Sequence, residues 1–206
     1  DVYLINTCTV TNTSDQKSRK MIRQARAKNK DAIVVAMGCF TQIRNNDNQI
    51  MDFVDVVIGN KDKSKVVDLT EDYIKNKQKI AKIEDINEAD FDDMEISYFN
   101  TRTRALVKIE DGCENFCSYC IIPYVRGRVR SKKPERVIEE AKRLVNNGYK
   151  EIVLTGIHTG HYGADLKDYD FSDLLLELEK IDGLDRIRIS SIEITELNDK
   201  FLSVLR

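Results

Sequence analysis

The sequence contains no tryptophan, only five cysteines and no apolar run that approaches the length of a membrane span. Hydrophobic residues make up 41% and charged residues 33% of its 206 positions, which is typical of a soluble, globular chain that does not contact a membrane. Nothing resembles a signal peptide, and an odd number of cysteines outside a secretory context argues against a disulfide framework. We therefore expect a cytoplasmic protein whose reduced thiols bind metal or react.

Charge is unevenly distributed along the chain. The formal net charge is only −2, but acidic residues gather between positions 84 and 95, and basic residues gather at 17–30 and 126–136. The length allows one large or two small domains, each with its own apolar core. Because the chain begins at Asp1 inside an expected strand, without an initiating methionine, we expect it to be a fragment.

In residues 1–75, apolar strands alternate with helices, the pattern of an α/β domain with a parallel sheet. The strands are expected at 2–5, 33–37 and 56–58, and the helices from Ser14 or Asp15 to about 29 and from about 63 to 75. In a parallel sheet the loops at the carboxyl ends of neighbouring strands lie along one edge, where ligands usually bind. Cys8 and Cys39, which follow the first two strands, are therefore expected to share that edge.

The alternation fades over residues 76–104, where the acidic residues gather, so we expect an acidic, solvated linker there. It resumes in a second domain at 105–206. The strands of this domain are expected at 105–109, 151–155 and 186–190, and its helices from Pro134 to about 147, at 172–181 and from about 196. Three consecutive strand-helix units again imply a parallel sheet.

Three of the five cysteines, Cys113, Cys117 and Cys120, lie within eight positions in the segment CENFCSYC. The polar residues between them argue against buried core thiols. Three thiolates do not complete a four-ligand zinc site, although His158 or His161 could complete one if folding brings it close. A 4Fe-4S cluster accepts thiolates at its corners, so three cysteines would hold three irons and leave the fourth open to a substrate or cofactor.

The CxxxCxxC spacing resembles that of the radical S-adenosylmethionine (SAM) superfamily. The resemblance implies that the open iron binds the amino and carboxylate groups of S-adenosylmethionine, and that an electron donor drives its cleavage to a radical that abstracts hydrogen from an inert carbon. It also implies which residues bind the cofactor. These are Tyr119 against the adenine, Gly156 in the segment LTGIHTG at the methionyl end, and Ser191 and Glu193 at the ribose or the methionyl carboxylate.

The order of four motifs extends the resemblance to the methylthiotransferase family. The motifs are INTCTVTNTSDQKSR, MGC, VKIEDGCENFCSYCIIPYVRGRVRS and EIVLTGIHTGHYG. The resemblance implies an amino-terminal domain that holds a second 4Fe-4S cluster, with Cys8 and Cys39 as two of its three cysteine ligands. We thus expect an incomplete methylthiotransferase domain followed by the first half of a radical SAM partial (β/α) barrel, and a fragment that is inactive alone.

The segments RGRVRS and LTGIHTG are most similar to the branch that modifies threonylcarbamoyladenosine at position 37 of tRNA, in the anticodon loop. We therefore expect a tRNA methylthiotransferase acting on C2 of that base, with Arg126, Arg128 and Arg130 as candidate RNA contacts. The basic residues of 17–30 are more simply the solvated face of a helix. Alternatives are the isopentenyladenosine and ribosomal-protein branches, an electron-transfer or structural iron-sulfur module, and a zinc-stabilised RNA-binding domain.

Overall fold

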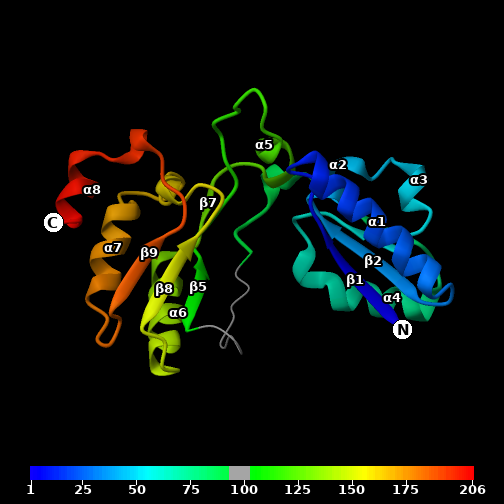
Figure 1. Cartoon of the computed structure of the whole chain (residues 1–206), viewed down its shortest axis with the longest axis horizontal. Helices are drawn as coiled ribbons and strands as arrows, with labels where there is room; N and C mark the ends of the chain where they lie inside the picture. Colours follow the sequence, from blue (N-terminus) through cyan, green and yellow to red (C-terminus); the bar gives the residue numbers. More distant parts are fainter. Residues whose placement is uncertain (93–102) are drawn as a thin grey trace. The chain divides into compact units, whose positions relative to one another are not determined.

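A computed structural model of the chain describes residues 1–92 and 103–206, which fold into two compact units (Figure 1). The first unit comprises residues 1–92 and 115–127, and the second comprises 103–114 and 128–206. Each unit contains its own parallel sheet, as the alternation of strands and helices predicts. None of the helices described has the length and apolar character needed to cross a membrane.

A four-stranded parallel sheet in the order β1-β2-β3-β4 forms the centre of the first unit. Its strands are β1 (Val2–Thr7), β2 (Ile33–Gly38), β3 (Val56–Ile58) and β4 (Ile80–Lys82). The first three are the strands that the sequence predicts. The last, β4, lies inside the predicted linker at 76–104, because three residues are too few to show a period and pairing with β3 alone defines the strand. Residues 93–102 of that predicted linker lie outside the described part of the chain.

Helices cover both faces of this sheet (Figure 1). The helix α1 (Asn12–Lys28) packs on the face that presents Ile5 and Val34, and α4 (Val66–Asn76) packs on the face that presents Val35. Period-two alternation along β2 thus sends successive side chains into two separate cores.

The start of α1 differs from the sequence prediction. Thr11, rather than Ser14 or Asp15, caps the helix, and its side-chain oxygen accepts a hydrogen bond from the N–H of Ser14 at 3.1 Å. Ser14 and Asp15 lie in the first turn instead. Thr11, Ser14 and Asp15 are all favourable near a helix start, so residue preference alone did not select among them.

The first unit also contains helices too short for the sequence pattern to reveal, since fewer than two turns give no apolar period. They are α2 (Cys39–Arg44), α3 (Asn48–Met51), α5 (Ile122–Arg126), and the 3₁₀ turns at Lys63–Lys65 and Ile86–Glu88. The segment 115–127, which the sequence places in the second domain, packs within the first unit through α5. Val125 is fully buried there, and its carbonyl oxygen accepts a hydrogen bond from Nδ2 of Asn60 at 2.5 Å.

The second unit is built on a parallel sheet in the order β5-β8-β9. Its strands are β5 (Arg104–Lys108), β8 (Glu151–Thr155) and β9 (Arg186–Ile189), and its helices are α6 (Pro134–Asn146), α7 (Phe171–Glu179) and α8 (Asp199–Val204). An antiparallel pair, β6 (Glu110–Asp111) and β7 (Arg130–Ser131), and the 3₁₀ turns at Thr159–His161 and Ile194–Glu196 complete the unit.

The helices α6 and α7 pack on the same face of this sheet. Val107 and Leu154 from the strands form one buried core with Val137, Leu144 and Leu174 from the helices. Consecutive strands are therefore neighbours with their helices on one side, as at the start of a (β/α) barrel. This arrangement leaves the carboxyl ends of β5 and β8 to position the functional loops.

Candidate metal and cofactor site

The loop that carries the three neighbouring cysteines follows β6 and leads into α5. Gly112 (φ +91°) and Phe116 (φ +45°) have left-handed backbone conformations, so the chain turns on both sides of Cys113. The N–H of Cys120 donates to the carbonyl oxygen of Cys117 at 2.8 Å, which puts these two cysteines on one turn. Cys113 belongs to the second unit and the other two to the first, so their joint role as cluster ligands stays a prediction.

The thiols of this loop are accessible. Cys117 is exposed, Cys113 and Cys120 are half-buried, and none of the five cysteines, all within the described residues, forms a disulfide. Tyr119, the predicted adenine contact, is 90% exposed. A large aromatic side chain with so little burial is available to stack on a ligand.

Glu110, the first residue of β6, is a buried acid that holds the loop that follows β8. Its Oε2 accepts the N–H of His158 at 2.8 Å, and the side chain is completely buried. Burial raises the pKa of Glu110 to about 8. Hydrogen bonds from the N–H groups of His158 and Ile157 lower this pKa, but burial has the larger effect. A Cβ on Gly156 would lie 2.6 Å from Oε2, so glycine is required there to admit the carboxyl group.

The raised pKa of Glu110 makes the stability of the second unit depend on pH. The unfolded chain loses this proton near pH 4.5, whereas the folded unit keeps it up to about pH 8. The free energy of unfolding is therefore expected to fall as pH rises through this window, by up to about 1.4 kcal/mol per pH unit. Glu110→Gln should remove this component, as measured by urea denaturation at several pH values. Glu139→Gln, at an exposed acid, is the control and should keep the wild-type slope; an unchanged slope in Glu110→Gln would show that Glu110 is ionised in the folded unit.

A second group of metal-binding side chains surrounds Cys113. Ligand atoms of Cys113, His158 and His161 lie within 4.8 Å of one another, and the two imidazole centroids are 4.0 Å apart. Nε2 of each histidine faces Oε1 of Glu196, in close contact for His158 and at 3.5 Å for His161. Burial, followed by the proximity of the His158 ring, lowers the pKa of His161. The sequence predicts that His158 or His161 could join Cys113 at a metal, and in the structure both histidines lie close to Cys113.

Glu196 was not predicted from the sequence, and a glycine makes room for it. A Cβ on Gly160 would overlap the carboxylate of Glu196. The second oxygen of that carboxylate accepts the N–H of Glu193 at 2.9 Å, and the carbonyl oxygen of Ser191 accepts a hydrogen bond from Thr159. The two segments predicted to bind the cofactor, after β8 and after β9, therefore meet in the second unit.

Cys8 and Cys39 lie on the same edge of the first sheet, as predicted. Each directly follows one member of the register pair Thr7 and Gly38 at the ends of β1 and β2. Cys8 is exposed, and the Oγ of Ser18 accepts its N–H at 3.0 Å. Cys39 is only 3% exposed.

The sulfur of Cys39 has two N–H donors that the sequence did not reveal. Sγ accepts from Nε of Arg126 at 3.2 Å and from Nδ2 of Asn60 at 3.5 Å. Donors to a sulfur are the outer-shell partners that a ligating thiolate uses, so this donor set fits a metal-bound Cys39. No local motif could have revealed Asn60, because the contact joins residues distant in sequence.

The three arginines predicted to contact RNA differ in their surroundings. Arg126 contacts Cys39, and the guanidinium of Arg130 is half-buried, 3.9 Å from a carboxylate oxygen of Asp111. Arg128 is exposed, and its carbonyl oxygen accepts from Arg130 at 3.0 Å. Arg128 is thus the one of the three best placed to reach a phosphate.

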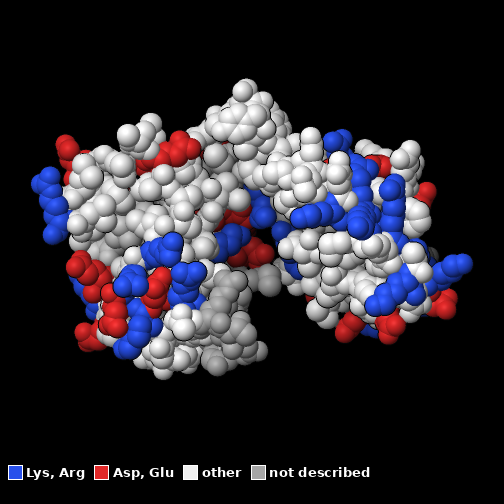
Figure 2. Space-filling view, in the orientation of Figure 1, with Lys and Arg blue, Asp and Glu red and all other residues white. Residues whose placement is uncertain are grey.

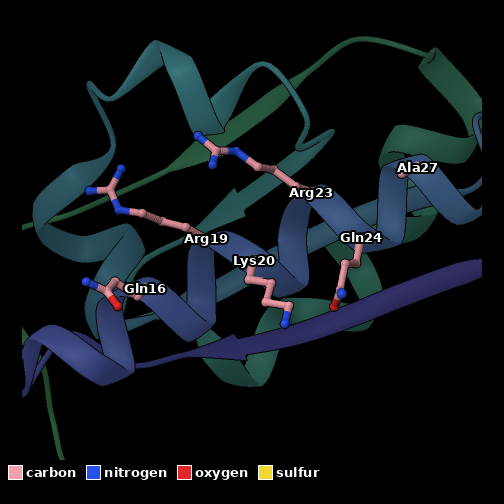
Figure 3. A pocket seen from close by; sticks show the side chains of 6 residues that line it. All are labelled: Gln16, Arg19, Lys20, Arg23, Gln24 and Ala27. Carbon is pink, nitrogen blue, oxygen red and sulfur yellow. The ribbon is translucent and has the colours of Figure 1, made fainter.

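Lysines and arginines also gather along α1 (Figure 2). A surface depression of about 410 Å³ runs along this helix (Figure 3). It is lined by Gln16, Arg19, Lys20, Arg23, Gln24 and Ala27. Arg19 is paired with Asp15 at 2.6 Å and with Asp47 at 2.5 Å. The exposed cations that line the depression are Lys20 and Arg23. The depression is shallow and follows one helix, as a solvated helix face does.

Known families and proteins match both units. Residues 1–59 match the family described as "Uncharacterized protein family UPF0004", and residues 107–206 match the family described as "Radical SAM superfamily". A Threonylcarbamoyladenosine tRNA methylthiotransferase MtaB from Bacillus subtilis is 47% identical over 207 residues, covering 100% of this chain and 46% of the relative. A protein of the same name from Aquifex aeolicus is 40% identical over 210 residues, covering 100% and 50%. A tRNA-2-methylthio-N(6)-dimethylallyladenosine synthase from Clostridium botulinum is 34% identical over 212 residues, covering 100% and 47%.

The parallel sheets, the cysteine loop and these matches define a radical SAM protein. More particularly, the chain belongs to the methylthiotransferase family, with an amino-terminal α/β unit followed by part of the radical SAM domain, as its motifs predict. The chain spans about half the length of the curated relatives that it matches.

Proposed function

We propose that the intact protein is a tRNA methylthiotransferase that adds a methylthio group to C2 of threonylcarbamoyladenosine at position 37 of tRNA. The observation that carries this proposal is the 47% identity, over the whole chain, to a relative named for that activity. The relative named for dimethylallyladenosine is 34% identical over the same span, which favours the threonylcarbamoyl substrate.

The donor atoms of both units suit the cofactors of such an enzyme. Cys113, Cys117 and Cys120 would hold a 4Fe-4S cluster with one iron open to S-adenosylmethionine, and Cys8 and Cys39 would supply two ligands of a second cluster. Accessible, reduced thiols on the loop and two N–H donors at Cys39 fit this assignment. When bound, the clusters and S-adenosylmethionine supply the radical and the sulfur chemistry at C2.

The chain itself would position the S-adenosylmethionine. Glu110 fixes the backbone of the loop that contains Gly156, the candidate for the methionyl end. Thr159 donates a hydrogen bond to the carbonyl oxygen of Ser191, and Glu193 lies two residues further along the same segment. Tyr119, exposed on the cysteine loop, would stack on the adenine.

The proposed substrate suits a radical reaction that the protein must shield from solvent. A base that reacts in such a site must leave its stack, and this costs least in a single-stranded anticodon loop. Arg128 would contact the phosphates, which attract exposed cations irrespective of sequence. An electron donor and a cytoplasmic location complete the proposal.

The test is mass spectrometry of tRNA nucleosides from cells that lack the intact gene. Loss of 2-methylthio-threonylcarbamoyladenosine alone, restored by the wild-type gene, supports the proposal. Loss of the methylthiolated isopentenyladenosine instead would assign the other branch. An unchanged nucleoside profile, with a methylthiolated ribosomal protein missing, would assign the protein substrate.

A further inference from the structure

The most compact set of metal-binding side chains in the second unit is Cys113 with the histidines after β8. Ligand atoms of Cys113, His158 and His161 all lie within 4.8 Å of one another. The edges of a tetrahedron around zinc are about 3.3 to 3.8 Å for nitrogen and sulfur ligands at their usual bond lengths, so small side-chain movements suffice to bring all three onto one ion.

Glu196 lies against both of these histidines. Its Oε1 contacts Nε2 of His158 and lies 3.5 Å from Nε2 of His161. Only 11% of its side chain is exposed, and the missing Cβ of Gly160 lets the carboxylate approach. Two imidazole nitrogens and a carboxylate oxygen that converge in a buried place need a proton or a cation between them.

We propose that Cys113, His158 and His161 form a binding site for a single divalent ion of the zinc type, with Glu196 as the acid that contacts and orients both histidines. Thiolate and imidazole are ligands that zinc takes in proteins, and three of them leave the fourth tetrahedral position for water or another small ligand. Mixed nitrogen and sulfur donors select zinc, or cobalt as its spectroscopic substitute, over magnesium and calcium, which prefer oxygen ligands.

The site has a consequence for the proposed iron-sulfur cluster, because both use the thiolate of Cys113. An ion held by Cys113 and the histidines withholds one of the three cluster ligands. Zinc bound here therefore blocks assembly of that cluster until it is removed. Binding of the ion does not depend on the proposed function, whereas this competition does.

The experiment is an anaerobic titration of the iron-free 206-residue chain with Co²⁺, followed by displacement with Zn²⁺. The wild-type chain should bind one Co²⁺ with the absorption of a tetrahedral site and a thiolate charge-transfer band. Cys113→Ala should lose that band. His161→Ala and His161→Gln should weaken Co²⁺ binding at least about tenfold, the loss typical even of an outer-shell change. Gly160→Ala, which displaces Glu196, should weaken it by a similar factor.

Cys117→Ala is the matched control, since it removes a cluster ligand and leaves the proposed site intact. It should bind Co²⁺ as the wild type does, and circular dichroism should show that all variants are folded. A charge-transfer band that survives in Cys113→Ala, or that needs Cys117 while His161→Ala leaves it unchanged, would overturn the proposal in favour of a site made of thiols alone.

Reconstitution with iron and sulfide then tests the competition separately. Pre-bound Zn²⁺ should prevent assembly of the cluster in the wild-type chain and not in His161→Ala. If the intact protein, reconstituted in the same way, assembles no cluster at all, the proposed function fails while the Co²⁺ result stands. If Zn²⁺ inhibits both chains equally, zinc acts elsewhere and the competition is wrong.

Discussion

Replacing Cys117 with alanine in the intact protein is expected to abolish the cleavage of S-adenosylmethionine to 5′-deoxyadenosine. Its thiol is exposed on the turn that it shares with Cys120, so removing it leaves the local backbone bond of 2.8 Å in place and takes away only a cluster ligand. Changes in the outer shell of a metal site already cost roughly 10- to 100-fold, and loss of a ligand should cost more than about 100-fold. Chromatography of the nucleoside product under reducing, anaerobic conditions measures the effect.

The neighbouring residue supplies the control for this experiment. Ser118 is also exposed on the same loop and is not a predicted ligand, so Ser118→Ala should leave cofactor cleavage within about twofold of the wild type. Iron analysis should show that Cys117→Ala keeps the second cluster. Reductive cleavage that persists in Cys117→Ala would show that the CxxxCxxC loop does not hold the cofactor cluster.

The sequence predicts the regular part of the fold well, because long apolar strands and an amphipathic helix leave a clear period. The strands β2 and β8 and the helix α6, which begins at Pro134 as expected, show this. The three residues of β4 carry no period, and pairing with β3 defines them. The segment 115–127 packs in the first unit because Val125 and Asn60 meet in space, which no local pattern records.

The candidate site was also predictable from the sequence only in part. Spacing along the chain predicts Cys113, Cys117 and Cys120 as cluster ligands, and the parallel sheet correctly predicts that Cys8 and Cys39 share an edge. The groups that surround these thiols come from distant segments, and only folding selects them. Glu110 lies within the motif VKIEDGCENFCSYCIIPYVRGRVRS, but its raised pKa results from burial in the folded unit, which the sequence does not show.

Alanine at Cys8 or at Cys39 in the intact protein is expected to remove the second cluster and spare the first. Both residues follow paired ends of β1 and β2, so each would supply one ligand from the same edge. The iron content should fall by about half, cofactor cleavage should continue and the methylthiolated nucleoside should disappear, because a three-cysteine cluster does not keep its place on two ligands. Iron analysis, product chromatography and nucleoside mass spectrometry measure these effects, and unchanged iron would mean that these cysteines serve another purpose.

The two variants differ in a second property, so each is the control for the other. Cys39 is buried, and its sulfur accepts bonds from Arg126 and Asn60, whereas Cys8 is exposed. Cys39→Ala takes an acceptor from two donors and should lower the free energy of unfolding of the cluster-free protein by about 1 to 3 kcal/mol, while Cys8→Ala should change it by less than about 0.5 kcal/mol. Urea denaturation compares them. Equal stabilities would show that the contacts of Arg126 and Asn60 with the sulfur contribute little to folding when no metal is bound. These two donors would then act only in the metal-bound protein, where N–H donors tune a ligated thiolate.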